Sequence, residues 1–308
     1  MKPTFDVQSV VNELSFVRQA WRVSRQRTTE PGGRELPSRE ALSSIIVGLR
    51  GVLFPMRLGP HDLRQENEDF YVGYTLDTVL HALWQQVVLE LSYTSKHLQS
   101  EQKEGDIESR AQALVSEFSL SLPEVRSLLD SDVIAAYEGD PAARSVDEVL
   151  LCYPGIEAMI HHRLAHRLYK LNLPLLARLV SELAHAQTGI DIHPGASIGS
   201  GFFIDHGTGV VIGETAVIGK RVRIYQAVTL GAKRFPTDSN GHPIKGQPRH
   251  PVLQDDVVIY AGATVLGCVT IGQGATIGGN VWVTHDVAPG THLTQARSLR
   301  DEHSSSVS

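Results

Sequence analysis

Two short segments carry the residue types that activate a hydroxyl group. Asp191-Ile192-His193-Pro194 is followed, fourteen residues after Asp191, by Asp205-His206-Gly207. A carboxylate that accepts a hydrogen bond from one imidazole nitrogen leaves the other nitrogen free to take a proton. Asp191 and His206 are therefore candidates for an orienting carboxylate and a general base. Taken alone, His206 fits a surface turn better, but flanking glycines and a break in the repeat described below weigh against that interpretation.

A second candidate segment is Pro248-Arg249-His250-Pro251. The planar guanidinium of Arg249 presents a fork of donors that suits a carboxylate, and the prolines would stiffen its approach. The alternative interpretation of this segment is a solvated basic loop.

A metal site is a competing explanation for the histidines, since His193, His206 and His250 could converge. Nothing in their spacing resembles that of zinc ligands, so we expect no metal. We expect His162 and His166, four residues apart on a helix, to form a polar helix face and not a ligand pair.

The elements that must position these residues follow from a six-residue period between Asp191 and Val283. An aliphatic residue recurs every six positions, as in Ile212, Ile218 and Ile224, and a small or β-branched residue precedes each by two. Helices repeat at 3.6 residues and strands at 2, so neither makes this pattern. Hexapeptides with glycine at the corners are typical of a parallel β-helix, in which three short strands close one triangular coil.

Two interruptions break the hexapeptide register, and both contain histidine. The step from Ile204 to Ile212 is eight residues, which predicts a bulge within 205–209. Between Leu230 and Leu253 about 17 surplus residues must leave the coil, which predicts an extruded loop at about 232–252. Function concentrates on long loops of rigid scaffolds.

Residues 1–187 have apolar spacings of 3 and 4 with Pro and Gly punctuation, which predicts a helical domain. The predicted fold class is therefore α+β, with helical domain 1–187, a β-helix domain 188–290 and a short tail 291–308. A net charge of −6 gives no indication of a nucleic-acid partner or an anionic membrane surface. The start of the chain lacks a signal-peptide pattern and no run is long enough to span a membrane, so we expect a cytoplasmic protein. Cys152 and Cys268 are expected to be reduced packing cysteines.

The segments DIHPGASIGSGFFIDHGTGVVIGETAVIG and RHPVLQDDVVIYAGATVLG resemble serine O-acetyltransferases, a branch of the left-handed β-helix acyltransferase superfamily. The similarity covers about residues 140–285. It implies transfer of an acetyl group from acetyl-CoA to L-serine, giving O-acetyl-L-serine for cysteine biosynthesis. The alternative is an acetyltransferase for another small hydroxy-amino acid or a sugar, or, in a different class, a β-helix scaffold or metal protein without acyl transfer.

The resemblance also implies roles for single residues. His206 would be the general base, Asp191 its orienting partner and His250 a second histidine of the site. Asp140 and Asp205 would hold the serine ammonium group, and Arg249 the serine carboxylate. The predicted CoA contacts are Gly231, Ala261 and Gly279.

Family resemblance further implies a homo-oligomer, either a trimer or a dimer of trimers joined by the helical domain, and feedback inhibition by L-cysteine. The C-terminal residues Ser305-Ser306-Val307-Ser308 lack the terminal Ile by which many members bind O-acetylserine sulfhydrylase, which argues against that complex. The long loop departs from the compact glycine-rich loop of the shorter bacterial members, and residues 1–135 resemble the family only in being helical.

Overall fold

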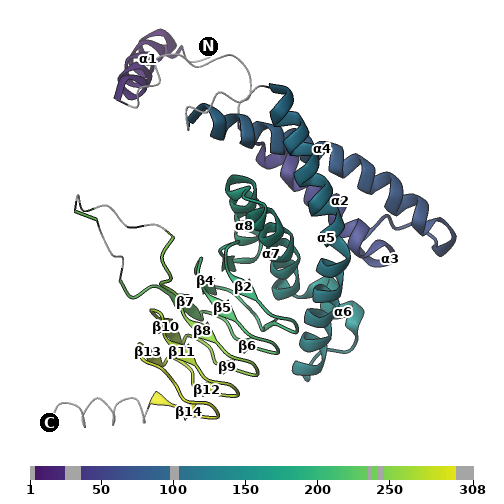
Figure 1. Ribbon diagram of the computed structural model, residues 1–308, viewed down its shortest axis with the longest axis vertical. Helices are drawn as coiled ribbons and strands as arrows, with labels where there is room; N and C mark the ends of the chain where they lie inside the picture. The colour runs from purple at the N-terminus through teal and green to yellow at the C-terminus, as the bar shows by residue number, and fades with distance from the viewer. Residues whose placement is uncertain are drawn as a thin grey trace. The chain divides into compact units, whose positions relative to one another are not determined.

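The computed structural model describes residues 4–24, 36–97, 104–234, 238–239, 241, 244 and 246–295. The chain divides into two compact units, Met1–Glu35 and Leu36–Ser308. The first unit contains helix α1 (Val7–Ser24), none of whose residues is buried. The second unit contains the other helices and all the described strands (Figure 1).

Helices occupy the second unit as far as Thr188. They are α2 (Arg39–Leu53), α3 (Pro55–Leu58), the short 3-10 helix η1 (Gln65–Asn67), α4 (Glu68–His97), α5 (Glu104–Gly139), α6 (Val146–Cys152), α7 (Pro154–Lys170) and α8 (Pro174–Thr188). Local sequence sets the ends of several: Ser38 caps α2 by accepting from the Ala41 amide at 3.2 Å. At the end of α8, Gly189 adopts a left-handed φ of 69°, which turns the chain into the first strand two residues later. None of the described helices has the length and apolar character needed to cross a membrane.

From Asp191 onward, short parallel strands form three sheets, as the six-residue period predicted (Figure 1). Sheet A contains β1 (Asp191–Ile192), β4 (Val211–Ile212), β7 (Thr229–Gly231), β10 (Thr264–Leu266) and β13 (Trp282–Val283). Sheet B contains β2 (Ser197–Ile198), β5 (Val217–Ile218), β8 (Val252–Leu253) and β11 (Thr270–Ile271). Sheet C contains β3 (Phe203–Ile204), β6 (Arg223–Ile224), β9 (Val258–Ile259), β12 (Thr276–Ile277) and β14 (His292–Leu293).

The two predicted apolar columns fill the interior of the coil. Successive strands within a sheet pair in parallel, so that Ile192 lies beside Ile212 and Ile212 beside Leu230. These aliphatic side chains are at most 4 % exposed, and Ala216 and Ala263 of the small column are at most 1 % exposed. The prediction of a helical part followed by a left-handed parallel β-helix is confirmed.

The interruptions lie where the register predicted them. The surplus residues after Ile204 form a turn in which the Gly207 amide donates to the Asp205 carbonyl at 2.7 Å and the Val210 amide to the Gly207 carbonyl at 3.0 Å. Strand β7 ends at Gly231 and β8 begins at Val252, so the second interruption is a loop between sheets A and B.

The predicted boundary between coil and tail at residue 290 is too early. Strand β14 pairs with β12 in sheet C, with Leu293 beside Ile277, so the coil continues at least to Leu293. Leu293 follows the buried Val287 by six residues and is itself only 6 % exposed, which continues the inward column. Residues 296–308, with the C-terminal segment compared above, lie outside the described residues. The division between a helical domain 1–187 and a β-helix domain that begins at residue 188 remains a prediction.

A buried ion pair joins the helices to the coil. The Arg163 guanidinium of α7 donates to both carboxylate oxygens of Asp132 on α5, at 3.1 and 3.0 Å. Arg163 also donates to the Ile198 and Gly199 carbonyls of the coil, and Asp132 accepts from the Phe202 amide at 2.9 Å. Burial raises the pKa of Asp132 and outweighs the opposing effect of Arg163. This network fixes the C-terminal end of α5 against the first coil.

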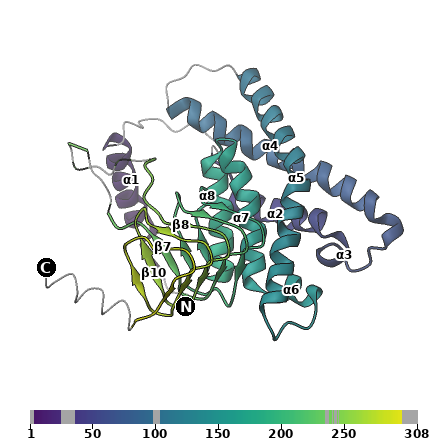
Figure 2. The ribbon, with the colours of Figure 1, turned by 60° about the horizontal axis from the view of Figure 1, so that its bottom comes forward.

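Two smaller expectations were wrong. Cys152 and Cys268 are free and exposed in the chain, so they do not pack inside it. Helix α7 lies between its helical neighbours and the first coil (Figure 2), which buries His162 and leaves His166 only partly exposed, so the two do not form a polar helix face. Burial holds the pKa of His162 well below its ordinary value.

Candidate active site

The first group of candidate residues gathers at the edge where sheet C passes into sheet A. We call Asp140, Tyr153, Asp205, His206 and Arg223 the His206 cluster. Asp205 and His206 lie in the turn between β3 and β4, and Arg223 is on β6 beside β3. Asp140 directly follows α5, where Gly139 lies so close to Phe203 that a Cβ atom would approach its ring to 2.9 Å. Packing of the α5 terminus on β3 thus brings Asp140 to Asp205.

Asp140 is held as an ionised carboxylate. The Tyr153 hydroxyl donates to its Oδ2 atom at 2.5 Å, and the Ala142 amide donates to its Oδ1 atom at 2.8 Å. The bond from Tyr153, followed by that from Ala142, lowers the pKa of Asp140. The same contact raises the pKa of Tyr153 to about 12. Asp140 therefore presents a negative charge at neutral pH, as a site for a cation requires.

Asp205 lies between a cation and the candidate base. Its Oδ2 atom accepts from the Arg223 Nη2 atom at 2.9 Å, and its Oδ1 atom is 3.8 Å from the His206 Nε2 atom. Arg223 also donates to the Gly139 carbonyl at 2.6 Å, which ties the helical part to this corner. His206 has a left-handed φ of 59° and its side chain is 71 % exposed. In the single chain the imidazole is therefore open to a substrate or to a second molecule.

Asp191 lies near this corner but has no hydrogen bond to His206 in the structure. Strand pairing places Asp191 beside Val211, directly after the turn that carries His206. Its carboxylate approaches two residues of α8 instead, because ligand atoms of Glu182, His185 and Asp191 lie within 4.8 Å of one another. The orienting role predicted for Asp191 remains a prediction.

The second group of candidates gathers at the opposite edge, where sheet A passes into sheet B. We call Tyr169, His193, Glu214, Arg249 and His250 the Arg249 cluster. Glu214 follows β4, His193 follows β1, and Arg249 and His250 end the loop that precedes β8. Tyr169 reaches the group from α7, with its ring edge-on to that of His193 at 5.7 Å between centroids.

Glu214 holds the Arg249 side chain. Its Oε2 atom accepts from the Arg249 Nη2 atom, and its Oε1 atom accepts from the Tyr169 hydroxyl at 2.8 Å. Burial alone would raise the pKa of Glu214, but the bonds from Tyr169 and Arg249 outweigh burial and lower it. The guanidinium is therefore oriented by a fixed anion. Among the described residues its other donors have one further partner, the Gln247 carbonyl at a long 3.4 Å from Nη1, so they are left for a ligand.

His250 is held in one tautomer. The Thr215 amide donates to its Nδ1 atom at 3.1 Å, so Nδ1 is an acceptor and the proton of the neutral ring lies on Nε2. The Thr215 hydroxyl lies 2.8 Å from the same nitrogen and accepts from the Arg249 and His250 amides at 2.9 and 3.2 Å. Burial, followed by the charge of Arg249, lowers the pKa of His250. The ring is therefore a neutral hydrogen-bond donor.

Strand β4 separates the two clusters within one chain. Asp205 and His206 precede Val211–Ile212, whereas Glu214 follows it. One face of the coil spans several extended residues, so the clusters are on the order of 15 Å apart. His193 and His250 therefore do not converge with His206 in a single chain, contrary to the alternative metal-site hypothesis.

The predicted CoA contacts also divide between these edges. Ala261 and Gly279 lie on successive coils at the edge between sheets C and A, where the Asn280 amide donates to the Ala261 carbonyl at 2.9 Å. A Cβ atom on Gly279 would lie 3.2 Å from that carbonyl oxygen, so glycine at this position leaves the surface beside the carbonyl uncovered. Gly231 ends β7 at the edge between sheets A and B.

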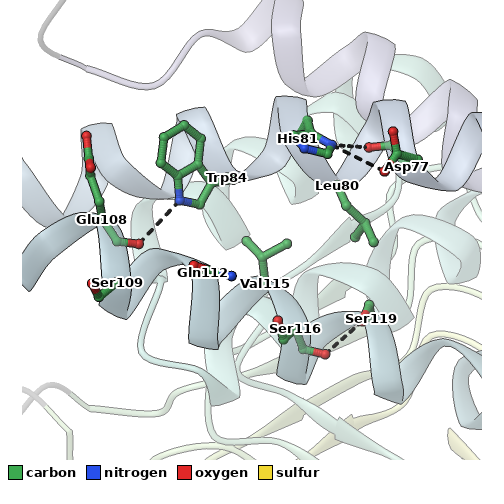
Figure 3. Close-up of a pocket in the computed structure, with 10 residues that line it drawn as sticks. All are labelled: Asp77, Leu80, His81, Trp84, Glu108, Ser109, Gln112, Val115, Ser116 and Ser119. Carbon is green, nitrogen blue, oxygen red and sulfur yellow. Dashed lines mark hydrogen bonds and ion pairs between the residues drawn. The ribbon is translucent and has the colours of Figure 1, made fainter. Parts of the chain in front are cut away.

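Other features of the described residues offer less to this chemistry. The partly exposed group Glu182, His185 and Asp191 has the donor types of a cation site. A pocket of about 550 Å³ lies between α4 and α5, lined by Trp84, His81 and Glu108 among others (Figure 3). It contains none of the predicted site residues.

Several residues of the clusters were not predicted from the sequence. Arg223 lies on β6, Tyr169 on α7 and Tyr153 between α6 and α7, and nothing in their local sequence points to the site. Glu214 carried a usable signal, because an acidic residue at a coil corner, one coil from the Arg249 segment, is suited to pair with that arginine.

Comparisons with known proteins agree with this geometry. Residues 250–285 match the family model "Bacterial transferase hexapeptide (six repeats)". The chain is 57 % identical over 273 residues to a plasmid serine acetyltransferase of Synechococcus elongatus, covering 88 % of this chain and 85 % of that protein. Its structure is similar to that of serine acetyltransferase 1 of Entamoeba histolytica in complex with L-cysteine, with a TM-score of 0.71, 37 % identity and coverage of 82 % and 86 % of the two chains. A serine acetyltransferase in complex with CoA is similar with a TM-score of 0.50, 27 % identity and coverage of 80 % and 94 %.

Proposed function

The chain belongs to the serine acetyltransferase family, and from this premise we propose that it transfers the acetyl group of acetyl-CoA to the hydroxyl of L-serine. The products are O-acetyl-L-serine and CoA, and the product serves cysteine biosynthesis. One observation carries the assignment of roles: carboxylates and a candidate base occupy one edge of sheet A, and an anchored guanidinium and a neutral histidine occupy the other.

The two clusters match the two charged ends of an amino acid. Asp140 and Asp205 bind the serine ammonium group, and Arg249 binds its carboxylate through the donors that Glu214 does not use. Tyr153 and Arg223 hold the two carboxylates in place. A sugar lacks both charges and would leave these groups unpaired.

His206 acts as the general base. As the serine oxygen attacks the thioester carbonyl carbon, the imidazole takes the hydroxyl proton, and it returns this proton to the departing CoA sulfur when the tetrahedral intermediate collapses. In the proposed mechanism Asp191 orients the ring, and Asp205 stabilises the imidazolium from 3.8 Å. The Nε2 proton of His250 is available to the developing oxyanion.

A second copy of the chain completes the site. Because β4 separates the clusters, one serine molecule cannot reach both on the same chain, whereas the edge of one coil placed against the opposite edge of another brings them together. A closed trimer satisfies this requirement three times by symmetry. CoA then lies in the groove between the copies, with Ala261 and Gly279 from one and Gly231 from the other. Sedimentation distinguishes a trimer from a dimer of trimers joined by the helices.

L-Cysteine fits the same amino-acid site, since it differs from L-serine only in SH for OH. Both charged ends would be held by Asp140, Asp205 and Arg249, while the thiol replaces the reacting hydroxyl. We expect inhibition that is competitive with L-serine.

Complementation tests the shared site. His206→Ala and Arg249→Ala chains should each be inactive, whereas chains unfolded and refolded together should recover activity. Roughly a quarter of wild-type activity is expected from an equal mixture, because each site takes one cluster from each of two copies. The matched control mixes His206→Ala with Asp140→Ala, which damage the same cluster and should stay inactive. No recovery in the first mixture would refute the shared site.

A substrate panel tests the reaction separately. Release of free CoA from acetyl-CoA should be fast with L-serine and slow with L-homoserine, L-threonine or a sugar. Faster turnover of a sugar would overturn the assignment of substrate, whatever the result of complementation.

A further inference from the structure

Helix α1 carries an apolar seam that stays exposed among the residues of its unit that the structure describes. Val7, Val10, Leu14 and Val17 are 63 %, 55 %, 50 % and 61 % exposed, and no residue of the helix is buried. Helices in proteins owe most of their stability to packing of an apolar face, so an 18-residue helix with this exposure lacks its main stabilising contact.

The spacing of these residues is that of a coiled coil. Val7, Leu14 and Trp21 recur at steps of seven, and Val10 and Val17 lie three residues after the first two. They occupy the a and d positions of a heptad, which form the contact seam between supercoiled helices. The opposite side is polar and is made by Gln8, Asn12, Ser15, Gln19 and Arg22. Phe16 and Val23 lie outside the seam, at c positions.

Charges beside the seam select the partner and its direction. Glu13 occupies a g position and Arg18 the e position of the following heptad. In a parallel, in-register pair, a g residue lies beside the next e residue of the neighbouring helix, so Glu13 of one copy faces Arg18 of another. We propose that α1 forms a parallel coiled coil with the α1 helices of other copies of this chain.

The composition of α1 disfavours a membrane as the occupant of this face. Helices that lie on membranes carry a polar face rich in Lys and Arg. The charged residues of α1 are Glu13, Arg18 and Arg22, which leaves one net positive charge. Charge pairing between copies uses Glu13, whereas an anionic surface would repel it.

The seam spans about 27 Å and fewer than three heptads, which is short for an independent coiled coil. The inference therefore rests on the oligomer proposed above, which would hold the helices at an effective concentration on the order of millimolar. It adds a contact between copies that the shared active site does not require.

Disulfide trapping tests the contact in the full-length chain. In a background with Cys152→Ser and Cys268→Ser, the variant Leu14→Cys at a or Val17→Cys at d should form covalent dimers on mild oxidation, each pairing with itself. The matched control Asn12→Cys lies at f, on the far side of the helix, and should be trapped several-fold less. Equal trapping of Asn12→Cys would overturn the proposal, and so would an absence of trapping at both seam positions.

Charge reversal tests the partner. Added to Leu14→Cys, Glu13→Arg alone and Arg18→Glu alone should each lower the trapped fraction several-fold, and the two together should restore it. If α1 packs on another part of its own chain, the double charge reversal should not restore trapping. If α1 serves a membrane, the chain should bind phosphatidylglycerol vesicles and charge reversal should leave trapping unchanged. Either result overturns the coiled coil. Sedimentation and acetyl transfer on the same samples separate the two proposals. A normal, active oligomer without trapping removes only the coiled coil, whereas a monomer removes the proposed assembly.

Discussion

Glu214, at the corner that follows β4, accepts a hydrogen bond from the guanidinium of Arg249, at the end of the long loop. The end of that loop is thereby fixed to the coil, and Thr215 strengthens the attachment by accepting from the Arg249 and His250 amides. The arginine proposed to bind the serine carboxylate is thus oriented before the substrate arrives.

Removing the charge of Glu214 should weaken serine binding more than catalysis. A hydrogen bond to a charged group contributes about 1.5–3 kcal/mol, so Glu214→Gln should raise the KM for L-serine about tenfold or more. The KM for acetyl-CoA should change little. Steady-state kinetics check this, with the exposed Glu66→Gln as the control. An unchanged KM for serine would show that Arg249 does not need Glu214.

Removal of the base should affect the chemical step. His206→Ala should lower kcat by roughly 10²–10⁴ with the fold intact, which is the usual contribution of a positioned base. Asp191→Asn should lower kcat less, because it only orients the ring, and should leave acetyl-CoA affinity nearly unchanged. Near-normal turnover by folded His206→Ala would eliminate the mechanism.

Gly213 provides a steric test of His250. A Cβ atom at this position would lie 2.0 Å from the imidazole, so Gly213→Ala must displace the ring. We expect kcat to fall about tenfold or more, as when a hydrogen-bond donor to an oxyanion is displaced. Gly73→Ala is the control, because nothing lies within 4 Å of the added atom. Equal activities of the two variants would exclude His250 from the reaction.

The lowered pKa of His193 predicts that the folded protein loses stability in acid. Burial, followed by the charge of Arg178, lowers its pKa from the ordinary 6.5 to about 4. The folded protein then keeps this ring neutral while the unfolded chain takes up a proton below about pH 6.5. The contribution of the neutral His193 ring to the stability of the fold is therefore fully present above pH 6.5, and it is lost as the pH falls from 6.5 toward 4.

His193→Asn should reduce that loss, because Asn retains an acceptor for the Gly195 amide, which His193 Nδ1 binds at 3.0 Å, but does not titrate. Allowing for solvent screening of a half-buried side chain, the difference is about 1 kcal/mol, or about 2–4 °C in Tm. Thermal unfolding at pH 7 and pH 5 measures it. His61→Asn, at an exposed histidine, should follow the wild type, and a His193→Asn protein with the same acid loss would contradict the prediction.

The buried pair of Asp132 and Arg163 should be critical for stability. Arg163→Met leaves the fully buried Asp132 without its partner, which costs about 3–5 kcal/mol. The urea midpoint should fall accordingly. Arg221→Met breaks an exposed pair with Asp256 and should leave the midpoint nearly unchanged. Equal midpoints for the two variants would show that the helices do not depend on this pair.

The sequence alone determined the coil, because a six-residue period specifies which side chains point inward, and stacking the coils buries them whatever the rest of the chain does. Ile212, Ile218 and Ile224 thus identify strands, interior and corners together. The same period locates the interruptions, since a departure from six has to leave the coil, and it places His206 and Arg249 within or at the end of them.

Only the tertiary structure decided which outward-facing groups meet. Asp140 lies at the same corner as Asp205 because α5 packs on β3, and Arg223 reaches both Asp205 and the end of α5 from the next coil. The separation of the two clusters by β4 likewise depends on how the coil closes, not on distance along the chain. Local periodicity records burial, but it contains no information on how helices dock or which corners of neighbouring coils align.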